Sequence, residues 1–133
     1  MSASASTGFT GYDWPVLSIS HDGQETRIPA GMRVALRFSP GGQFGANDSV
    51  NFRSGTYRTT GDGFTIGDLF STLVAYSGDN PAVLLAMSAM DSFETNAQAT
   101  TTLTGNRLVV GVASYTLTCQ RGAPRPDDPG ALE

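Results

Sequence analysis

Hydrophobic and polar residues alternate with a period of two along much of the chain. In "RVALRF", residues 33–38, every second residue is apolar from Val34 onward, which is typical of a strand with one buried face. The turn-forming "SPGG" at 39–42 follows, and "QFGAND" at 43–48 can return as its hairpin partner. The pattern predicts an antiparallel sheet built from hairpins.

Two similar glycine-containing segments, "TGDGFTIG" at 60–67 and "TGNRLVVG" at 104–111, each lie between strand-like runs. A phosphate-binding loop would enter a helix and normally supply a Lys, whereas both segments lead into strand-like sequence and the chain has no Lys. Gly adopts positive φ freely and Asn and Asp tolerate it, so both segments predict short hairpin turns. "SYTLTCQ" at 114–120 extends the second pair.

One segment has the signature of an α-helix, which we expect around residues 80–94. Asp79 or Asn80 can cap its N-terminus, and Pro81 suits the first helical position. The expected buried face comprises Val83, Ala86, Met87 and Met90, flanked by Leu84 and Phe93. The predicted fold class is therefore mostly β (α+β), a small antiparallel β-barrel or sandwich of about eight strands. We expect its one helix to cover an open end or an edge.

The composition agrees with one turn-rich domain. The chain has 133 residues, of which 39% are hydrophobic and only 15% charged, and such a length holds one core but not two. Residues 1–12 and 122–133 offer little apolar surface, so we expect disordered ends around a domain at 13–121. The final "ALE" resembles a cloning remnant.

The distribution of charge argues against nucleic acid as a partner. The net charge is −4 and the eight basic residues are single, scattered Arg, whereas nucleic-acid binding needs clustered cations. No stretch approaches the roughly 18 apolar residues of a membrane span, and the first residues lack the basic start and apolar centre of a signal peptide. We expect a monomer that is cytoplasmic, or that was exported with a leader since removed.

The chain offers no ligand set for a metal or a cofactor, and we expect neither. Zinc needs several Cys or His ligands, but the chain has one of each, and we expect Cys119 to be buried and inert. Calcium needs a dense loop of oxygen ligands, which neither "GDN" at 78–80 nor "DDP" at 127–129 supplies. The aspartates that could form carboxylate pairs each suit a turn, a cap or an exposed position: Asp48, Asp62, Asp68, Asp79 and Asp91.

His21 is the one residue around which a catalytic site could be built. It lies at an expected turn beside Asp22, with Ser18 and Ser20 nearby in the sequence. Adjacent side chains of a strand point apart, however, and the chain contains no nucleophile-elbow sequence. We therefore interpret His21 as a solvated turn residue and expect no catalytic residues.

A series of landmarks along most of the chain resembles the META domain, the family that includes the bacterial heat-shock-induced protein HslJ. The order is an early Trp, a strand that ends in Phe, an Asn followed by Gly-x-Tyr, then Ile-Gly, Ser-Thr, a helix and a closing Gly-Asn-x-Leu. Here these residues are Trp14, Phe38, Asn51, Gly55, Tyr57, Ile66, Gly67, Ser71, Thr72, Gly105, Asn106 and Leu108.

The resemblance implies a compact β-barrel-like domain with a helix, commonly exported or lipid-anchored in bacteria. It also implies a link, in some members, to stress or antibiotic tolerance and to virulence, but no catalytic activity and no ligand. Many members have Gly-Cys-Asn where this chain has Ser49-Val50-Asn51, and a second Cys where it has Tyr76. A redox role of those cysteines is therefore not implied here.

We accordingly expect a non-enzymatic domain of the bacterial cell envelope or exterior that acts as a structural or interaction module with an unidentified protein partner. One alternative is a carrier of a small hydrophobic ligand, since a barrel of about eight strands can enclose one. Another is a weak hydrolase that uses His21. We expect Asn51 and Thr72 to be buried and bonded to backbone, and four core side chains to be buried: Trp14, Phe38, Tyr57 and Leu117.

Overall fold

The computed structural model describes residues 8–124 as nine strands and one helix. The strands are β1 (Tyr12–His21), β2 (Gln24–Arg27), β3 (Val34–Phe38), β4 (Gln43–Asp48), β5 (Phe52–Thr59), β6 (Gly63–Ser71), β7 (Gln98–Thr104), β8 (Arg107–Val112) and β9 (Tyr115–Gln120). The helix, α1 (Pro81–Asp91), lies between β6 and β7 in the chain. Residues 1–7 and 125–133, which hold most of the expected disordered ends and the final "ALE", lie outside the described residues.

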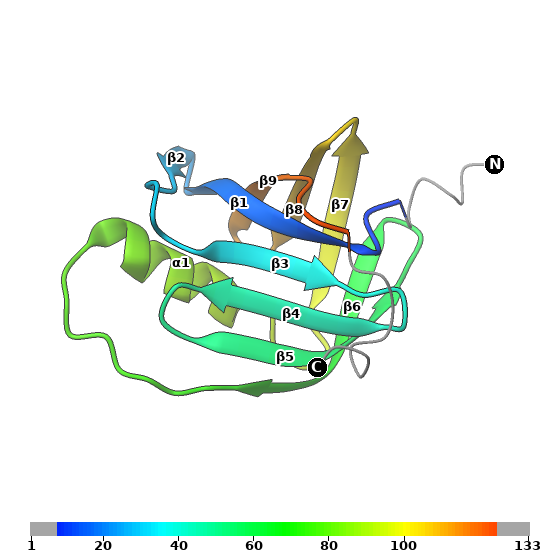
Figure 1. The fold of residues 1–133 in the computed structure, drawn as a ribbon, viewed down its shortest axis with the longest axis horizontal. Coiled ribbons are helices and arrows are strands. Elements are labelled where there is room, and N and C mark those ends of the chain that lie inside the picture. The colour runs from blue at the N-terminus through cyan, green and yellow to red at the C-terminus, as the bar shows by residue number, and fades with distance from the viewer. Residues whose placement is uncertain (1–7, 125–133) are drawn as a thin grey trace.

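Eight of the nine strands close into an antiparallel barrel, which confirms the predicted fold class. β1 pairs with β3, and the order continues through β4, β5, β6, β7, β8 and β9 back to β1. β1 closes the ring because its first residues pair with β3 and its later residues with β9. β2 lies outside the ring and pairs with the last residues of β1 (Figure 1).

The three hairpins predicted from the turn sequences are present, as β3–β4, β5–β6 and β7–β8. Gly105 in the last of these has a φ of +61°, which residues with a side chain seldom adopt. In the β5–β6 hairpin the constraint falls on Gly63, because a Cβ there would lie 1.9 Å from the backbone oxygen of Ala99. Both glycine segments are therefore hairpin turns, as predicted.

Aromatic rings fill the inside of the barrel. The ring of Phe38 contacts those of Phe9, Phe44, Tyr57 and Phe64, with centroids 4.8–5.6 Å apart. Edge-to-face and tilted arrangements of this kind are the favoured geometries of aromatic pairs. The expected burial is confirmed for all four core side chains: Trp14, Phe38, Tyr57 and Leu117. This packing counts against a carrier that would enclose its ligand in the barrel.

α1 packs against β4 and β1 and covers the core at the left-hand end of the barrel in Figure 1. Its N-terminus is formed as predicted, since the Asn80 side chain accepts a hydrogen bond from the backbone N–H of Ala82 at 2.9 Å and Pro81 begins the helix. The helix ends at Asp91, before the expected residue 94, and Phe93 is buried just beyond it.

The buried face of α1 differs in part from the prediction. Leu84 is exposed and Met87 is only half-buried, whereas Ala82 and Ala89 are buried. The buried face thus consists of three Ala side chains together with the expected Val83 and Met90.

The packed part of the chain extends beyond the expected boundaries at 13 and 121. Phe9 is fully buried, and its carbonyl accepts a hydrogen bond from the indole N–H of Trp14 at 2.8 Å. At the other end, the backbone N–H of Gly122 donates to Asp13 and that of Asp13 donates to Ala123. Apolar content is low in both segments, so their sequences did not predict these contacts.

Candidate functional site: an exposed apolar surface beside an open strand edge

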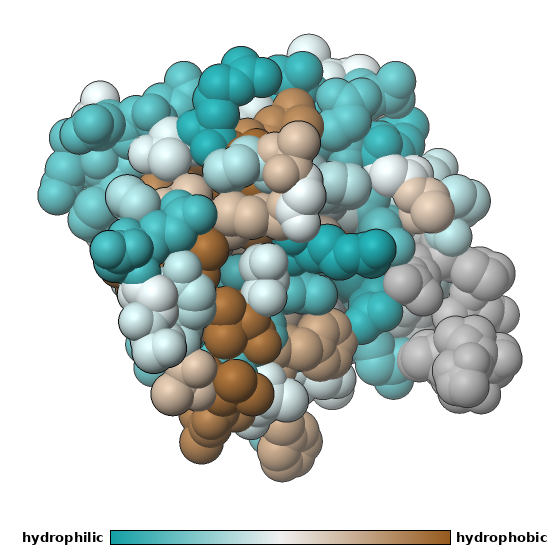
Figure 2. Space-filling model, turned by 60° about the vertical axis from the view of Figure 1, so that its left-hand side comes forward, coloured by the Kyte–Doolittle hydropathy of each residue, from teal (hydrophilic) through white to brown (hydrophobic). Residues whose placement is uncertain are grey.

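Three large apolar side chains are exposed at and just after the end of β6. Phe70 is 76%, Leu73 92% and Val74 57% exposed, and we call these three residues the β6 apolar surface. Figure 2, in which the left-hand side of Figure 1 comes forward, shows hydrophobic side chains gathered on the lower part of that face. Single exposed apolar residues are ordinary, but a group of them marks an interaction site more often than chance.

Hydrogen bonds of Asn51 hold the part of this surface that follows β6. Its Nδ2 donates to the carbonyl of Val74 at 3.0 Å, and its Oδ1 accepts from the backbone N–H of Val74 at 2.7 Å. The same Oδ1 accepts from the hydroxyl of Thr72 at 2.8 Å. The residues on both sides of Leu73 are therefore anchored, and the backbone presents Leu73 to solvent.

These bonds confirm the prediction for Asn51, which is buried and bonded to backbone, but that for Thr72 is wrong in part. The hydroxyl of Thr72 accepts from the backbone N–H of Phe52 at 3.0 Å, as expected, yet the residue is exposed. Thr72 directly follows β6, where one side of the strand faces solvent.

An ion-pair network fixes the turn that carries Asn51. Asp48 is fully buried, and its Oδ1 accepts from the backbone N–H groups of Val50 at 2.8 Å and Asn51 at 2.6 Å. Its Oδ2 accepts from Nη1 of Arg53 at 2.8 Å, and Nη2 of Arg53 donates to Asp91 at the end of α1. A buried carboxylate is tolerated when it is paired and hydrogen-bonded in this way. The network joins the turn to β5 and to the helix.

β6 has an open edge along its last residues. β5 pairs with β6 as far as Ser71, whereas β7 pairs only with Gly63–Thr65. Backbone hydrogen bonds of Ile66 with Asn96 and Ala97 end the contact on that side. In the part of the chain that the structure describes, no strand pairs with this side of β6 beyond Ile66. In Figure 1 the end of β6 is the strand that runs below β5.

Two of the landmark glycines lie where β5 and β6 approach each other closely. The register between β5 and β6 shifts between Gly55 and Tyr57, and such a bulge bends a strand. A Cβ on Gly55 would lie 2.0 Å from the carbonyl oxygen of Asp68, and one on Gly67 would lie 2.3 Å from Oγ1 of Thr56. At Gly55 only glycine permits this approach of the two backbones, whereas at Gly67 the neighbouring atom belongs to a side chain.

The other landmarks have roles in the core or in turns. Trp14 is buried, and the hydroxyl of Tyr57 donates to the carbonyl of Ser39 at 2.7 Å. Burial raises the pKa of Tyr57 to about 12. Leu108 is buried, and Asn106 follows Gly105 in the β7–β8 turn.

His21 has a serine and an aspartate close by, although the serine is not one that the sequence suggested. Nδ1 of His21 lies 3.2 Å from Oγ of Ser114, and Nε2 lies 3.4 Å from Oδ2 of Asp22. Ser18 instead donates its hydroxyl to Glu25 at 2.7 Å. Ser114 follows β8, so its position opposite the β1–β2 turn depends on barrel closure and has no signal in the local sequence.

The setting of His21 is that of a surface turn. Its ring stacks on that of Tyr115, with centroids 4.4 Å apart. The side chain of Asp22 is 83% exposed, so water competes for the carboxylate that would have to orient the imidazole.

Cys119 is buried, as expected, and burial raises the pKa of its thiol to about 12. A thiol with so high a pKa is protonated near neutral pH, and the thiolate is the reactive form.

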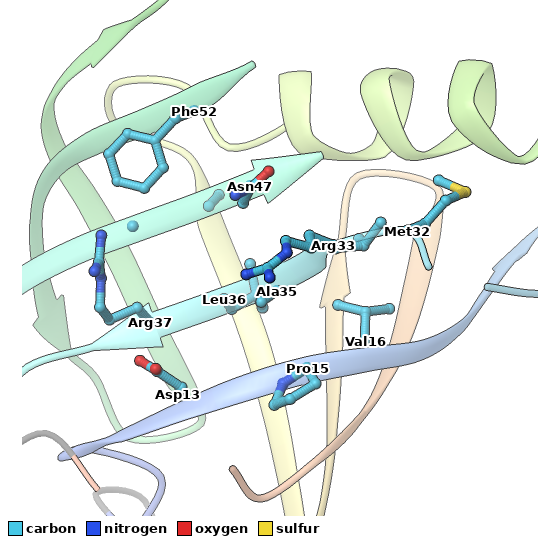
Figure 3. A pocket seen from close by; sticks show the side chains of 13 residues that line it. Asp13, Pro15, Val16, Met32, Arg33, Ala35, Leu36, Arg37, Asn47 and Phe52 are labelled. Carbon is cyan, nitrogen blue, oxygen red and sulfur yellow. The ribbon is translucent and has the colours of Figure 1, made fainter. Parts of the chain in front are cut away.

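A groove of about 440 Å³ lies outside the barrel, over β1, β3 and β4 (Figure 3). Arg37 crosses it, since a Cβ on Gly45 would lie 2.9 Å from Nε and Nη2 of Arg37. The guanidinium carbon is 5.2 Å from the centroid of the Phe52 ring, and the strand register places Asp13 opposite Arg37. Protein groups therefore already surround the main cation of the groove, which makes it a weaker candidate than the β6 apolar surface.

Residues 8–124 contain no helix that is long and apolar enough to cross a membrane. Within the same range, no group of three or more His, Cys, Asp or Glu side chains is placed to hold a metal ion.

Comparison with known proteins gives a family and two similar folds. The model of the META domain matches residues 7–121, and no curated protein sequence matches the chain. An NMR structure of a protein from Burkholderia xenovorans has a TM-score of 0.68 and 17% identity over 90% of this chain and 88% of that chain. A second NMR structure has a TM-score of 0.61 and 18% identity over 85% of this chain and 91% of that chain. At these identities the likeness concerns the fold alone.

Proposed function

This chain belongs to the META domain family, and we propose that it is a non-enzymatic domain that acts by binding another protein chain. The observation that carries this proposal is the β6 apolar surface, which is exposed although pairing with β5 fixes the backbone of Phe70 and hydrogen bonds of Asn51 fix that of Val74. Burial of apolar area contributes about 25 cal/mol per Å². A surface that is already ordered loses less conformational entropy when a partner covers it.

A site-specific photocrosslinker at position 70 tests this proposal in cells that naturally make the protein. Benzoylphenylalanine in place of Phe70 should give adducts heavier than the single chain, and Leu73→Asp in the same chain should abolish them. The control is the same crosslinker at Thr102, an exposed residue of β7. Equal adducts at both positions, or none at position 70, would contradict binding through this surface.

The proposal places the protein at the bacterial cell envelope or outside the cell, with a role in stress tolerance. This part is supported by the family resemblance. Fractionation of the native cells, followed by detection with an antibody to the domain, should find the protein in envelope or secreted fractions. Recovery only from the cytoplasm would refute this location and would leave the binding proposal intact.

The contact of His21 with Ser114 and Asp22 is the observation that favours a weak hydrolase as a second candidate. A hydrolase of this type should cleave an activated ester such as p-nitrophenyl acetate, and His21→Ala and Ser114→Ala should each remove that activity. We expect both variants to match the parent chain, which would leave the non-enzymatic proposal standing.

A further inference from the structure

The backbone groups at the open edge of β6 belong to Leu69 and Ser71. The N–H of Thr72 donates to the carbonyl of Phe52 at 3.0 Å, so Thr72 is a hydrogen-bonded partner within the β5–β6 ladder. Bonded and non-bonded pairs alternate along an antiparallel ladder, and Phe70, opposite Ser54, is therefore the next bonded residue. The N–H and C=O groups of Leu69 and Ser71 point the other way, to the open side.

Beyond the bulge that precedes it, the stretch Leu69–Ser71 has no charged residue and no Pro, which are residues that protect strand edges from pairing. β2, which also lies at an edge, carries the exposed charges of Glu25 and Arg27. Charge is a common means of keeping an edge unpaired. The open part of β6 has a single charge, Asp68, and leads into the β6 apolar surface.

We propose that two copies of this chain pair antiparallel through the open edges of their β6 strands. The proposal rests on the proposed function, since it names the partner of the same surface. A register centred on Phe70 places Leu69 opposite Ser71 of the second copy, so the outward backbone groups of both strands bond to each other. Extended segments add to open sheet edges by such main-chain bonds.

The side chains suit this register. Phe70 would face Phe70 of the second copy in a non-bonded pair, where Cβ atoms are about 4.5–5.5 Å apart and aromatic pairs are favourable. Asp68 would lie opposite Thr72, so like charges do not meet across the seam. Each copy has a net charge of −4, and salt at about 0.15 M screens that repulsion beyond roughly 8 Å. The pairing should therefore tighten as salt is raised from low concentration.

Sedimentation velocity of the full chain tests the proposal. So small an interface predicts weak pairing, and we expect the weight-average mass to rise from one copy toward two between about 1 and 500 μM. Ser71→Pro removes an outward N–H without removing a bond to β5, so it should weaken pairing at least about tenfold. Ser71→Ala, which keeps the N–H, is the matched control and should pair like the parent chain.

The register is tested by opposite charges at position 70. Phe70→Asp and Phe70→Arg should each be monomeric alone, because each places like charges opposite each other, and an equimolar mixture should form heterodimers. Near-ultraviolet circular dichroism from the buried Trp14 checks that each variant is folded.

A parent chain that stays monomeric at every concentration overturns the proposal. So does unchanged pairing in Ser71→Pro, or a mixture of the charged variants that forms no heterodimer. Crosslinks from position 70 to a different protein, together with a monomeric parent chain, would leave the proposed function standing and refute the second copy as partner. Absence of both crosslinks and dimers would refute the two together.

Discussion

Phe38 and Phe70 illustrate how position decides the role of one residue type. Phe38 is fully buried among other aromatic rings, whereas Phe70 is 76% exposed on the last part of β6. Burial removes apolar area from water in the first case, and only binding can do so in the second. The two residues therefore separate the stability of the fold from its capacity to interact.

Phe38→Ala should lower the free energy of unfolding by about 3–5 kcal/mol, because it leaves a cavity among the core rings. Phe70→Ala is the matched control and should change it by no more than about 0.5 kcal/mol. Urea denaturation followed by fluorescence measures both. A similar loss of unfolding free energy in both variants would mean that Phe70 contributes to the core.

The buried thiol predicts an alkaline limit to stability. The pKa of Cys119 rises from 9.0 to about 12 and that of Tyr57 from 10.0 to about 12. The unfolded chain therefore loses these protons at lower pH than the folded chain does, and the free energy of unfolding should fall from about pH 9 upward. In Cys119→Ala the free energy of unfolding should begin to fall only near pH 10, because Tyr57 is then the only one of the two groups left to titrate. An identical fall in the parent chain and in Cys119→Ala would contradict a contribution of the Cys119 thiol.

At the scale of elements, the turns and helix start were predictable because neighbouring residues determine them. Pro81 and Asn80 begin α1 as expected, and the glycine-containing turns join the expected strands. The end of β6–β7 pairing at Thr65 was not predictable, because it depends on close contacts between strands and not on neighbouring residues. The contact of His21 with Ser114 was not predictable for the same reason, since barrel closure brings the two residues together. Contacts of this kind limit how much of the candidate site can be predicted from the sequence.

The β5–β6 turn provides a matched test of these close contacts. Gly63→Ala should destabilise the protein by about 1–3 kcal/mol or more, because its Cβ would meet the carbonyl oxygen of Ala99. At Gly61 a Cβ would have no atom within 4 Å and φ is not positive, so Gly61→Ala should be neutral or stabilising by up to about 1 kcal/mol. Thermal and urea unfolding of both variants measure the difference, and equal effects would be inconsistent with the packing described here.

At the scale of the whole molecule, the ion pairs of Arg53 connect the barrel to its helix. Arg53 bonds to Asp48 inside the turn before β5 and to Asp91 at the end of α1. The first pair is buried, while the side chain of Asp91 is 72% exposed. The rest of β5, all of β6 and most of α1 separate Arg53 from Asp91 in the chain, so no local pattern predicted their contact.

Removing one partner of the buried pair should cost far more than removing the exposed one. Arg53→Met leaves the carboxylate of Asp48 buried without its counter-charge and should lower the free energy of unfolding by about 3–5 kcal/mol. Asp91→Asn should lower it by no more than about 1 kcal/mol. Urea denaturation near pH 7 distinguishes the two, and comparable losses would show that the helix contact dominates.

The two ends of the described chain meet in the same ladder, since Tyr12 bridges to Pro124 and Gly122 donates to Asp13 at 2.8 Å. The strands at this seam, β1 and β9, run antiparallel. The start of β1 and the end of β9 therefore lie at the same end of this seam. A force that pulls the two ends of the chain apart would break the hydrogen bonds between β1 and β9 one after another, and would not load many of them at once. The domain should open at low force when it is pulled from its ends, even though its aromatic core resists heat and urea.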